Sequence, residues 1–339
     1  MIHRNRKINL VTQHNINWLR QFPNGKPQWG EFDFLFNSNL LDYDWLVVFD
    51  DINEKIVLKD GFKNTLHIAT EPPTIVNYDE YFLRQFSYVV QIQSNLNHGG
   101  NISSPLGLNW HIGVSKKREL YYEDIDMLFN FPKKKLLSVI TSNKSFTKEH
   151  KKRIEFVKKL KDYYGDNIDF YGRGFNDMDD KLVALKDYRF HVVIENSVYD
   201  NYFTEKITDC FLAGSFPLYH GCKNLENYFP KDSFCRIDIN DFDKSISIID
   251  SAISNNLDIK NYRFLESAKY KVLEKYNIFP LIVDLINKIE KGEYGSNVGK
   301  NLEKNKIFSY RSEIFKMKYS SSFKIRFKSY LKYIFNLKF

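Results

Sequence analysis

The feature that most constrains this chain is a regular alternation of short apolar runs with longer amphipathic stretches. Buried parallel strands produce short apolar runs, and the helices that connect them produce amphipathic stretches, so the pattern predicts an α/β protein with parallel sheets. The runs that we expect to form strands are INLVT, DWLVVFDD, TLHIAT and YVVQIQ, followed by LLSVIT, NIDFYG, FHVVIEN, SFPLYHG and CRIDI. Two such series predict two Rossmann-like domains that face each other across a cleft.

The boundaries of these domains follow from changes in composition. Residues 115–135 are charged and irregular, which predicts a linker between the two series of strands. We therefore expect one α/β domain over residues 1–130 and a second over residues 131–292, with residues 241–292 helical throughout. A basic amphipathic tail would occupy residues 293–339.

The composition excludes several classes of protein. A hydrophobic content of 43% with 27% charged residues is typical of a soluble globular protein. No apolar run reaches the roughly 20 residues that cross a bilayer, and the basic start MIHRNRKINLVTQ is not followed by a hydrophobic segment of signal-peptide length. Cys210, Cys222 and Cys235 are widely spaced, so they indicate neither a zinc site nor a disulfide framework. These features favour a reducing cytoplasm.

The basic charge belongs to the tail. The net charge is +8, and residues 306–339 contain nine Lys or Arg and one Glu, so the rest of the chain is close to neutral. From Phe323 onward, helical spacing gathers apolar and aromatic residues on one face and lysines on the other. Such a helix is typical of a segment that lies on an anionic membrane surface, where each Lys or Arg contributes on the order of 1 kcal/mol. The alternatives are a helix packed on the body, an oligomer contact and nucleic acid, and the neutral body argues against the last.

A candidate anion site lies in the stretch DNYFTEKITDCFLAGSFPLYHG. Thr204 is a plausible N-cap of a short helix, and Gly214 stands where a helix ends in a left-handed residue. Lys206 then places a cation in the first turn, where the helix dipole is already positive. A bound anion such as a phosphate would explain it, because phosphates prefer helix N-termini at the carboxyl ends of strands. The alternative is that Lys206 points to solvent.

Two more charged residues are candidates. Arg153 lies on the inward face of the helix KEHKKRIEFVKKLKDYY, so it either binds an anion through its guanidinium or pairs with an internal carboxylate. Glu71 follows the strand TLHIAT and precedes two prolines, which stop the strand. A carboxylate at that place can face a cleft as a general base, or it can be an ordinary turn residue.

The segment FHVVIENSVYDNYFTEKITDCFLAGSFPLYHG closely resembles the donor-binding motif of the α-1,3/4-fucosyltransferases, glycosyltransferase family 10. The resemblance continues into FPKDSFCRIDINDFD, and upstream into SNKSFTKEHKKRIEFVKKL and IDFYGRG. It covers about residues 135–245. The N-terminal half is similar mainly through HIATEPP, where the family usually has Ser-Pro or Asn after the glutamate and this chain has Pro72-Pro73.

This resemblance implies the GT-B architecture, with an N-terminal acceptor domain and a C-terminal domain that holds GDP-fucose. By position, it implies that Arg153 and Lys206 contact the diphosphate and that Asn196 and Tyr202 line the nucleotide-sugar pocket. It also implies that Glu205 lies beside the sugar ring, where it reads hydroxyl groups or steadies positive charge at the anomeric carbon.

The same resemblance implies that Glu71 is the catalytic base, which takes the proton from the acceptor hydroxyl in a single displacement that inverts the anomeric centre. We expect a fucosyltransferase with a glycan or glycolipid acceptor, in surface polysaccharide or lipopolysaccharide synthesis. We expect it to be peripheral on the cytoplasmic face of an anionic membrane, through residues 306–339. No cofactor or metal is expected, although stimulation by a divalent metal stays open. The alternatives are another GDP-sugar donor, or a catalytically silent GDP-sugar or membrane-binding protein of the same fold.

Overall fold

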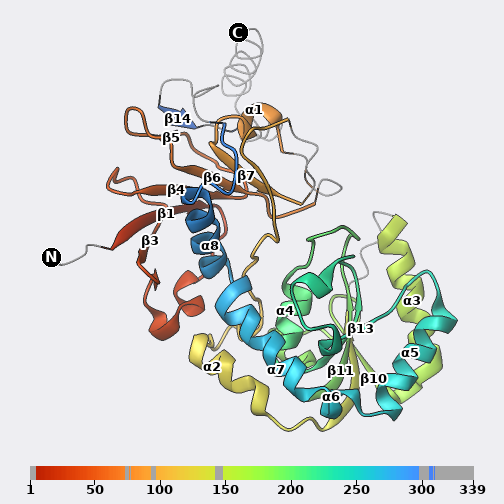
Figure 1. Cartoon of the computed structure of the whole chain (residues 1–339). Coiled ribbons are helices and arrows are strands. Elements are labelled where there is room, and N and C mark those ends of the chain that lie inside the picture. Colours follow the sequence, from red (N-terminus) through yellow and green to blue (C-terminus); the bar gives the residue numbers. More distant parts are fainter. Residues whose placement is uncertain are drawn as a thin grey trace, which may run out of the picture. The chain divides into compact units, whose positions relative to one another are not determined.

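The computed structural model describes residues 5–72, 76, 78–92, 97–141, 148–297, 305–307 and 309. The chain divides into two compact units, which we call unit 1 and unit 2 (Figure 1). Unit 1 comprises the described residues of Met1–Ile16, Pro27–Ser104 and Leu285–Phe339, and unit 2 comprises those of Asn17–Lys26 and Pro105–Asp284. Each unit contains its own sheet and its own core.

Unit 1 is built on a sheet in the order β2-β3-β1-β4-β6-β7-β8, in which every pairing is parallel except that of β2 with β3. Its strands are β1 (Arg6–Thr12), β2 (Gln28–Trp29), β3 (Phe32–Phe36), β4 (Trp45–Phe49), β6 (Thr65–Ile68), β7 (Tyr88–Gln91) and β8 (Asn101–Ser103). The central strands β4 and β6 are buried along their whole length, because helices or loops cover both faces of a parallel sheet. A separate pair, β5 (Ile56–Val57) and β14 (Lys306–Ile307), is antiparallel.

Short helical segments complete unit 1. Helix α1 (Glu80–Leu83) packs Phe82 against the sheet residues Val48 and Val89. Glu290, at the end of α8 (Ile278–Glu290), accepts hydrogen bonds from the side chains of Arg6 and Trp45.

Unit 2 contains a fully parallel sheet in the order β10-β9-β11-β12-β13. Its strands are β9 (Lys135–Ile140), β10 (Ile168–Tyr171), β11 (Tyr188–Ile194), β12 (Phe216–His220) and β13 (Cys235–Arg236). Strand β11 is central, with Val192 in register with Val139 on one side and Leu218 on the other. This position explains its almost continuous apolar sequence.

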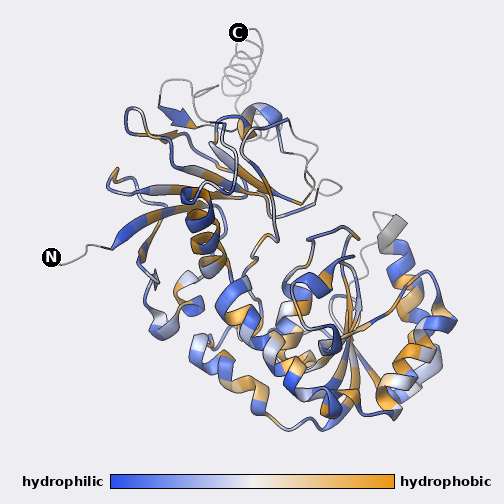
Figure 2. Cartoon of the chain, viewed as in Figure 1, coloured by the Kyte–Doolittle hydropathy of each residue, from blue (hydrophilic) through white to orange (hydrophobic). Residues whose placement is uncertain are grey.

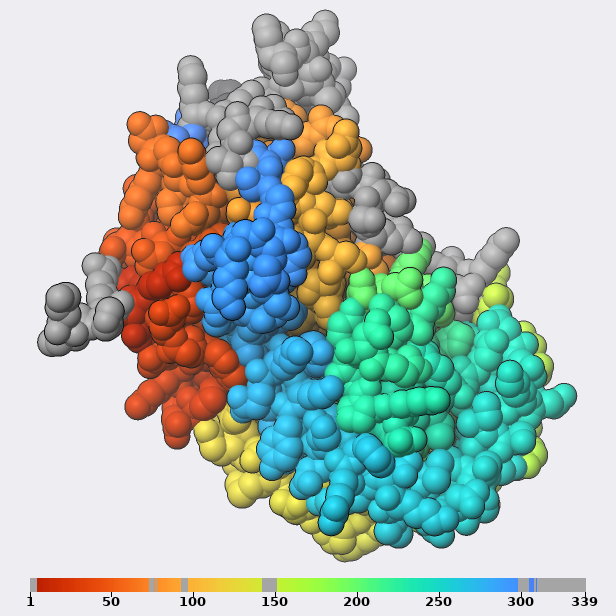
Figure 3. Space-filling view, viewed as in Figure 1, coloured from red at the N-terminus to blue at the C-terminus, as the bar shows by residue number. Residues whose placement is uncertain are grey.

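Helices cover both faces of this sheet (Figures 1 and 2). Helices α3 (Lys148–Tyr164) and α5 (Phe242–Ser254) pack their apolar sides on one face. Helices α4 (Glu205–Leu212) and α7 (Tyr262–Lys271) lie together on the other. Figure 3 shows the green and blue surfaces of unit 2 adjoining each other. The remaining helices are α2 (Tyr122–Met127), α6 (Leu257–Lys260), the 3-10 turns η1 (Trp18–Gln21), η2 (Pro23–Gly25), η3 (Leu128–Asn130), η4 (Gly165–Asn167), η5 (Lys181–Ala184), η6 (Leu225–Asn227) and η7 (Lys231–Ser233), and the π-helix η8 (Val272–Tyr276).

The prediction of an α/β protein with parallel sheets is confirmed, and each run that was expected to be a strand contains one. Residues 115–135 are not a plain linker, because they contain α2 and η3. The chain passes from unit 1 to unit 2 after residue 104 and returns to unit 1 after residue 284. The sequence had predicted these boundaries after residues 130 and 292. Residues 17–26 join unit 2 because the buried Arg20 guanidinium donates to the carbonyls of residues 110, 112 and 120.

The predicted amphipathic tail helix from Phe323 onward lies outside the described residues. Within residues 306–339 the structure describes Lys306, Ile307 and Ser309. Among the helices of the described part, none combines the length and the apolar character that would let it span a bilayer.

Candidate active site

The parallel strands of unit 2 bring four chain segments to one edge of the sheet, just after the carboxyl ends of β9, β10, β11 and β12. Two glycines permit the close packing there. Gly172 has φ of +110°, and a Cβ at this position would lie 2.0 Å from the Thr141 carbonyl oxygen. A Cβ on Gly221 would lie 2.5 Å from Cγ of Glu195. Ligands of open α/β sheets bind at this edge, so it is the natural place for a site in unit 2.

The loop between β11 and α4 is closed by a buried carboxylate. The Glu195 side chain accepts hydrogen bonds from the Thr204 amide (2.9 Å) and the Thr204 hydroxyl (2.7 Å). The same hydroxyl accepts from the Lys206 amide, which makes Thr204 the N-cap of α4 as predicted. Gly214 follows the helix with φ of +71°, also as predicted. Sequence alone did not single out Glu195, although it stands within the quoted motif.

Lys206 lies among carboxylates. Its Nζ is 3.4 Å from Oε2 of Glu195 and 3.6 Å from Oε1 of Glu205, and it donates to the Thr204 hydroxyl at 3.0 Å. The structure thus provides a reason for this cation that the sequence did not show, since it neutralises two buried acids. The side chain is 27% exposed, so the ammonium is also reachable from solvent.

Glu205 has a second cation beside it. The Lys181 ammonium, from η5, lies 3.1 Å from Oε1 of Glu205, whose side chain is 14% exposed. Burial by itself would raise the pKa of the Glu205 carboxyl, but the ammonium groups of Lys206 and Lys181 outweigh it and hold that pKa well below its usual range. Glu205 is therefore a fixed negative charge at the start of α4. Lys181 was missed by sequence reasoning because nothing near residue 181 marks it as a partner of a residue 24 positions later.

Asp209 follows one turn after Glu205 and is fully enclosed. Its Oδ1 accepts from the amides of His111 (2.8 Å) and Ile112 (3.4 Å), and its Oδ2 lies 3.7 Å from the Lys181 ammonium. Burial raises the pKa of the Asp209 carboxyl to about 7. Asp209 therefore ties residues 111 and 112 to α4 within unit 2, across almost 100 positions of the chain.

The side chains of Arg153 and Asn196, which the resemblance assigned to one donor pocket, contact each other. Arg153 is 7% exposed on α3, on the side that carries the buried Phe156 and Val157. Its Nη1 donates to Oδ1 of Asn196 at 3.0 Å, immediately after β11. The inward orientation of this arginine is confirmed, and its guanidinium is held at the carboxyl edge of the sheet.

The other two predicted site residues are Tyr202 and Glu71. Tyr202 is 1% exposed, so its side chain packs inside unit 2, and direct contact with a sugar would require it to be uncovered. Glu71 is half-buried in unit 1, three residues after β6 ends at Ile68. The preceding Thr70 amide is held by the Tyr78 hydroxyl at 3.1 Å. The predicted position at a strand end is confirmed, and the role as base stays a prediction.

The residues at the carboxyl edge of the unit 2 sheet can bind an anion through fixed charges and backbone amides. Within the described residues there is no group of three or more His, Cys, Asp or Glu side chains that could hold a metal ion. The described basic groups at this edge include the Arg153 guanidinium and the Lys206 ammonium, next to the first turn of α4. Positive groups held in place at a helix N-terminus suit a phosphate or diphosphate.

Residues 131–276 match the family model described as glycosyltransferase family 10 (fucosyltransferase), C-terminal. The chain is 35% identical over 117 residues to the mouse protein named 4-galactosyl-N-acetylglucosaminide 3-alpha-L-fucosyltransferase 9, a match that covers 33% of this chain and 31% of that protein. It is 40% identical over 74 residues to a fucosyltransferase-like protein of Arabidopsis thaliana, covering 21% and 14%. The chain thus spans about a third of the length of the first of these relatives.

Solved structures are similar over a longer stretch at low identity. An alpha1,3-fucosyltransferase with GDP has 14% identity and a TM-score of 0.49, covering 86% of this chain and 92% of that one. A structure of the same description with GDP-fucose has 14% identity and a TM-score of 0.48, covering 81% and 93%.

Proposed function

We propose that this chain, whose residues 131–276 belong to the C-terminal domain of glycosyltransferase family 10, transfers fucose from GDP-fucose to a hydroxyl group of a glycan. The observation that carries the proposal is the arrangement at the carboxyl edge of the unit 2 sheet. There, inside the matched segment, a buried Arg153 is held by Asn196 and Lys206 stands in the first turn of α4.

These groups would act on the leaving group. As the bond between fucose and GDP breaks, negative charge grows on the diphosphate, and cations that are already in place stabilise that state more than the ground state. The carboxylates around Lys206 hold its ammonium in position before the donor arrives. Glu205, a fixed anion at the same helix start, is suited to steady positive charge at the anomeric carbon.

The acceptor side of the reaction rests on Glu71. A hydroxyl is a weak nucleophile, so a carboxylate within hydrogen-bond reach would take its proton as the new bond forms. A single displacement of this kind inverts the anomeric centre. The name of the mouse relative specifies a 4-galactosyl-N-acetylglucosaminide, which we take as the first acceptor to test.

The direct test is to incubate the chain with a panel of GDP-sugars and glycan acceptors and to determine product mass. Addition of one deoxyhexose, seen with GDP-fucose alone, is the expected result. Glu71→Gln should abolish turnover while GDP binding survives. Transfer of another sugar would support the alternative that the donor is a different GDP-sugar. Undiminished turnover by Glu71→Gln would show that Glu71 is not the catalytic base. GDP binding without transfer by the unmodified chain would indicate a catalytically silent protein.

The donor site has its own test. Arg153→Met should weaken binding of GDP, measured by titration calorimetry, and lower kcat by on the order of 100-fold, the effect of removing one fixed group that stabilises developing charge. Lys159→Met is the matched control, because Lys159 lies on the same helix with its side chain 51% exposed and pairs with Glu155. Equal effects of the two substitutions would contradict a specific role for Arg153.

Contact with a membrane surface is a proposal from the basic tail, and a part in polysaccharide or lipopolysaccharide synthesis is a proposal from the fucosyltransferase activity at such a membrane. Flotation with anionic liposomes, compared between the whole chain and a chain that ends at residue 305, tests the first of them. Equal flotation would contradict it.

A further inference from the structure

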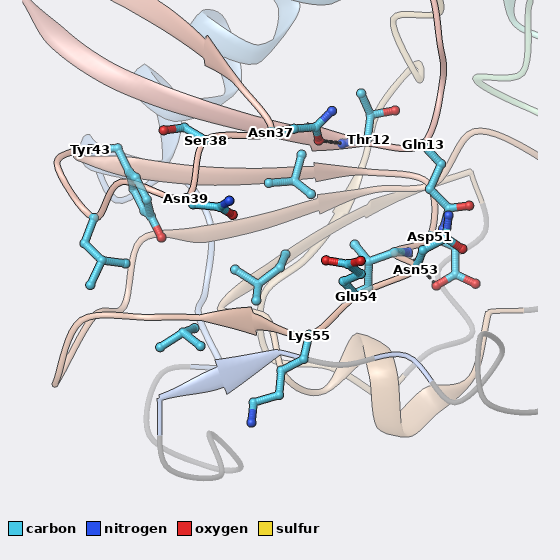
Figure 4. Close-up of a pocket in the computed structure, with 15 residues that line it drawn as sticks. Thr12, Gln13, Asn37, Ser38, Asn39, Tyr43, Asp51, Asn53, Glu54 and Lys55 are labelled. Atoms are coloured by element: carbon cyan, nitrogen blue, oxygen red, sulfur yellow. Dashed lines mark hydrogen bonds between the residues drawn. The ribbon is translucent and has the colours of Figure 1, made fainter. Parts of the chain in front are cut away.

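Unit 1 contains a pocket of about 570 Å³ that the donor site does not use. It is lined by the segments that follow β1, β3 and β4, with residues 51–57 forming one wall (Figure 4). Its size lies within the range of about 300–1,000 Å³ that small-molecule sites occupy.

The pocket lies at the point where the order in which strands are added to the sheet reverses. Strand β1 is followed along the chain by β3 on one side of it, and β4 then pairs with its other side, after which the sheet continues through β6. The segments that leave β1 and β4 at their carboxyl ends therefore run in opposite directions and leave a crevice between them. Such a switch point is where open α/β sheets bind their ligands.

The backbone around the crevice is held in an uncommon shape. Asn37 after β3 and Asp50 after β4 both have positive φ, +48° and +75°, which is unfavourable for residues other than glycine. Side chains retain these turns: Oδ1 of Asn37 accepts from the Thr12 amide at 2.9 Å, and Oδ1 of Asp50 accepts from the Tyr78 hydroxyl at 2.6 Å. The pocket is thus formed before any ligand binds, and strained backbone of this kind gathers at functional sites.

The polar groups of the pocket suit hydroxyl groups. Gln13, Asn39 and Asn53 line it with exposed amide side chains that have no hydrogen-bond partner in the described part of the chain. An amide both donates and accepts, as a sugar hydroxyl does. Figure 4 shows Gln13 and Asn53 near one end of the pocket and Asn39 nearer the other, so one extended ligand could contact all three.

The charges of the pocket disfavour a phosphate. Asp51 and Glu54 contribute two carboxylates, and Lys55, the single cation of the lining, extends away from the other labelled side chains (Figure 4). The apolar part of the lining, which includes Val11, Ile52 and Ile56, can pack against the C–H faces of a pyranose ring. A neutral molecule with many hydroxyl groups meets both requirements.

We infer that this pocket binds a neutral oligosaccharide. Within the proposed function, that oligosaccharide is part of the acceptor glycan, and this second step rests on the proposed function while the first does not. The pocket would then retain the acceptor through sugars other than the one that is modified.

The test uses the full chain and a panel of neutral oligosaccharides that includes 4-galactosyl-N-acetylglucosaminide, with inorganic pyrophosphate as the charged comparison. Binding is measured by saturation-transfer NMR and calorimetry. The double variant Asn39→Ala/Asn53→Ala should bind the best oligosaccharide about tenfold more weakly, because two hydrogen bonds of ordinary strength are lost. Gln28→Ala is the control, since Gln28 is an exposed amide of unit 1 outside the pocket. Both variants change only exposed side chains, so the fold should be retained.

A second measurement needs no variant. Hydrogen exchange of residues 51–57 should slow when the oligosaccharide is added to the unmodified chain. The inference is overturned if no neutral oligosaccharide binds, if inorganic pyrophosphate slows the exchange of residues 51–57 more than the oligosaccharide does, or if the double variant and Gln28→Ala behave alike. If the double variant transfers fucose with an unchanged acceptor KM, the inference that the pocket binds the acceptor is wrong, and the proposed function is unaffected. Oligosaccharide binding that the double variant weakens, without any transfer, overturns the proposed function and leaves the pocket intact.

Discussion

The Lys206 ammonium is stabilised by the two carboxylates that lie beside it. A cation in the first turn of a helix opposes the helix dipole by about 0.3–1 kcal/mol. Glu195 and Glu205, at 3.4 and 3.6 Å, offset this cost, because two carboxylates that are largely removed from water need a positive partner. Local neutralisation is compatible with the proposed binding of a diphosphate, because the two carboxylates hold the ammonium in place.

The residue-scale prediction concerns Asp209. Its folded-state pKa of about 7 lies above the ordinary 3.8, so between these pH values the folded chain holds a proton that the unfolded chain has released. The free energy of unfolding should therefore fall as pH rises from 4 to 7, by about 1.4 kcal/mol for each unit of difference at most. Asp209→Asn cannot ionise and keeps Oδ1 as an acceptor, so its stability should fall less over this window in denaturant titrations.

Asp162→Asn serves as the control for that experiment, because Asp162 is exposed on α3. It should follow the unmodified chain at every pH. Parallel curves for the unmodified chain and Asp209→Asn would show that Asp209 does not carry the proton.

At the scale of the element, α4 depends on a cap that is also a tether. Thr204 satisfies the first turn of the helix and donates to Glu195 at the end of β11, so one hydroxyl joins the strand to the helix. The caps of this helix were predictable because they depend on residues within one turn of its ends.

Thr204→Val should lower the free energy of unfolding by about 1–2 kcal/mol, the upper range for a lost cap, because Glu195 loses its hydroxyl donor as well. Thr204→Ser keeps the hydroxyl and should retain most of the stability. Both are measured by chemical denaturation at constant pH. A larger loss of stability in Thr204→Ser than in Thr204→Val would contradict this role of the hydroxyl, because Val retains the methyl group and Ser retains the hydroxyl.

At the scale of the whole molecule, the chain contains two cores with separate sheets. The core of unit 2 includes Phe156, Val192 and Ile249, and that of unit 1 includes Leu46, Phe82 and Val89. A ligand of one unit stabilises that unit by mass action, by about 2.7 kcal/mol at one hundred times its Kd.

GDP should therefore slow hydrogen exchange most strongly in β9, β11 and the start of α4, and much less in β4 and β6 of unit 1. Exchange followed by mass spectrometry, with and without saturating GDP, measures this. GMP, which lacks the second phosphate, is the control and should protect the same segments less. Protection confined to unit 1 would contradict a donor site at the carboxyl edge of the unit 2 sheet.

The sequence by itself determined the features that depend on near neighbours. Apolar runs predicted the buried strands, helical spacing turned Arg153 inward, and Thr204 and Gly214 marked the ends of α4, because periodicity and caps act over a few residues. The strand β3 was not predicted, although its sequence FDFLF begins with alternating apolar and polar residues. Five residues of this kind also occur in loops, so the pattern was too short to indicate a strand.

Only the tertiary structure decided which distant residues meet. Lys181 reaches Glu205, Asp209 holds the amides of residues 111 and 112, and Arg20 joins its segment to unit 2 through carbonyls about 90 to 100 positions away. The pocket of unit 1 likewise exists only once β3 and β4 have paired with opposite sides of β1. These contacts depend on the order of strands in a sheet, and many orders are compatible with the same local pattern of apolar and polar residues.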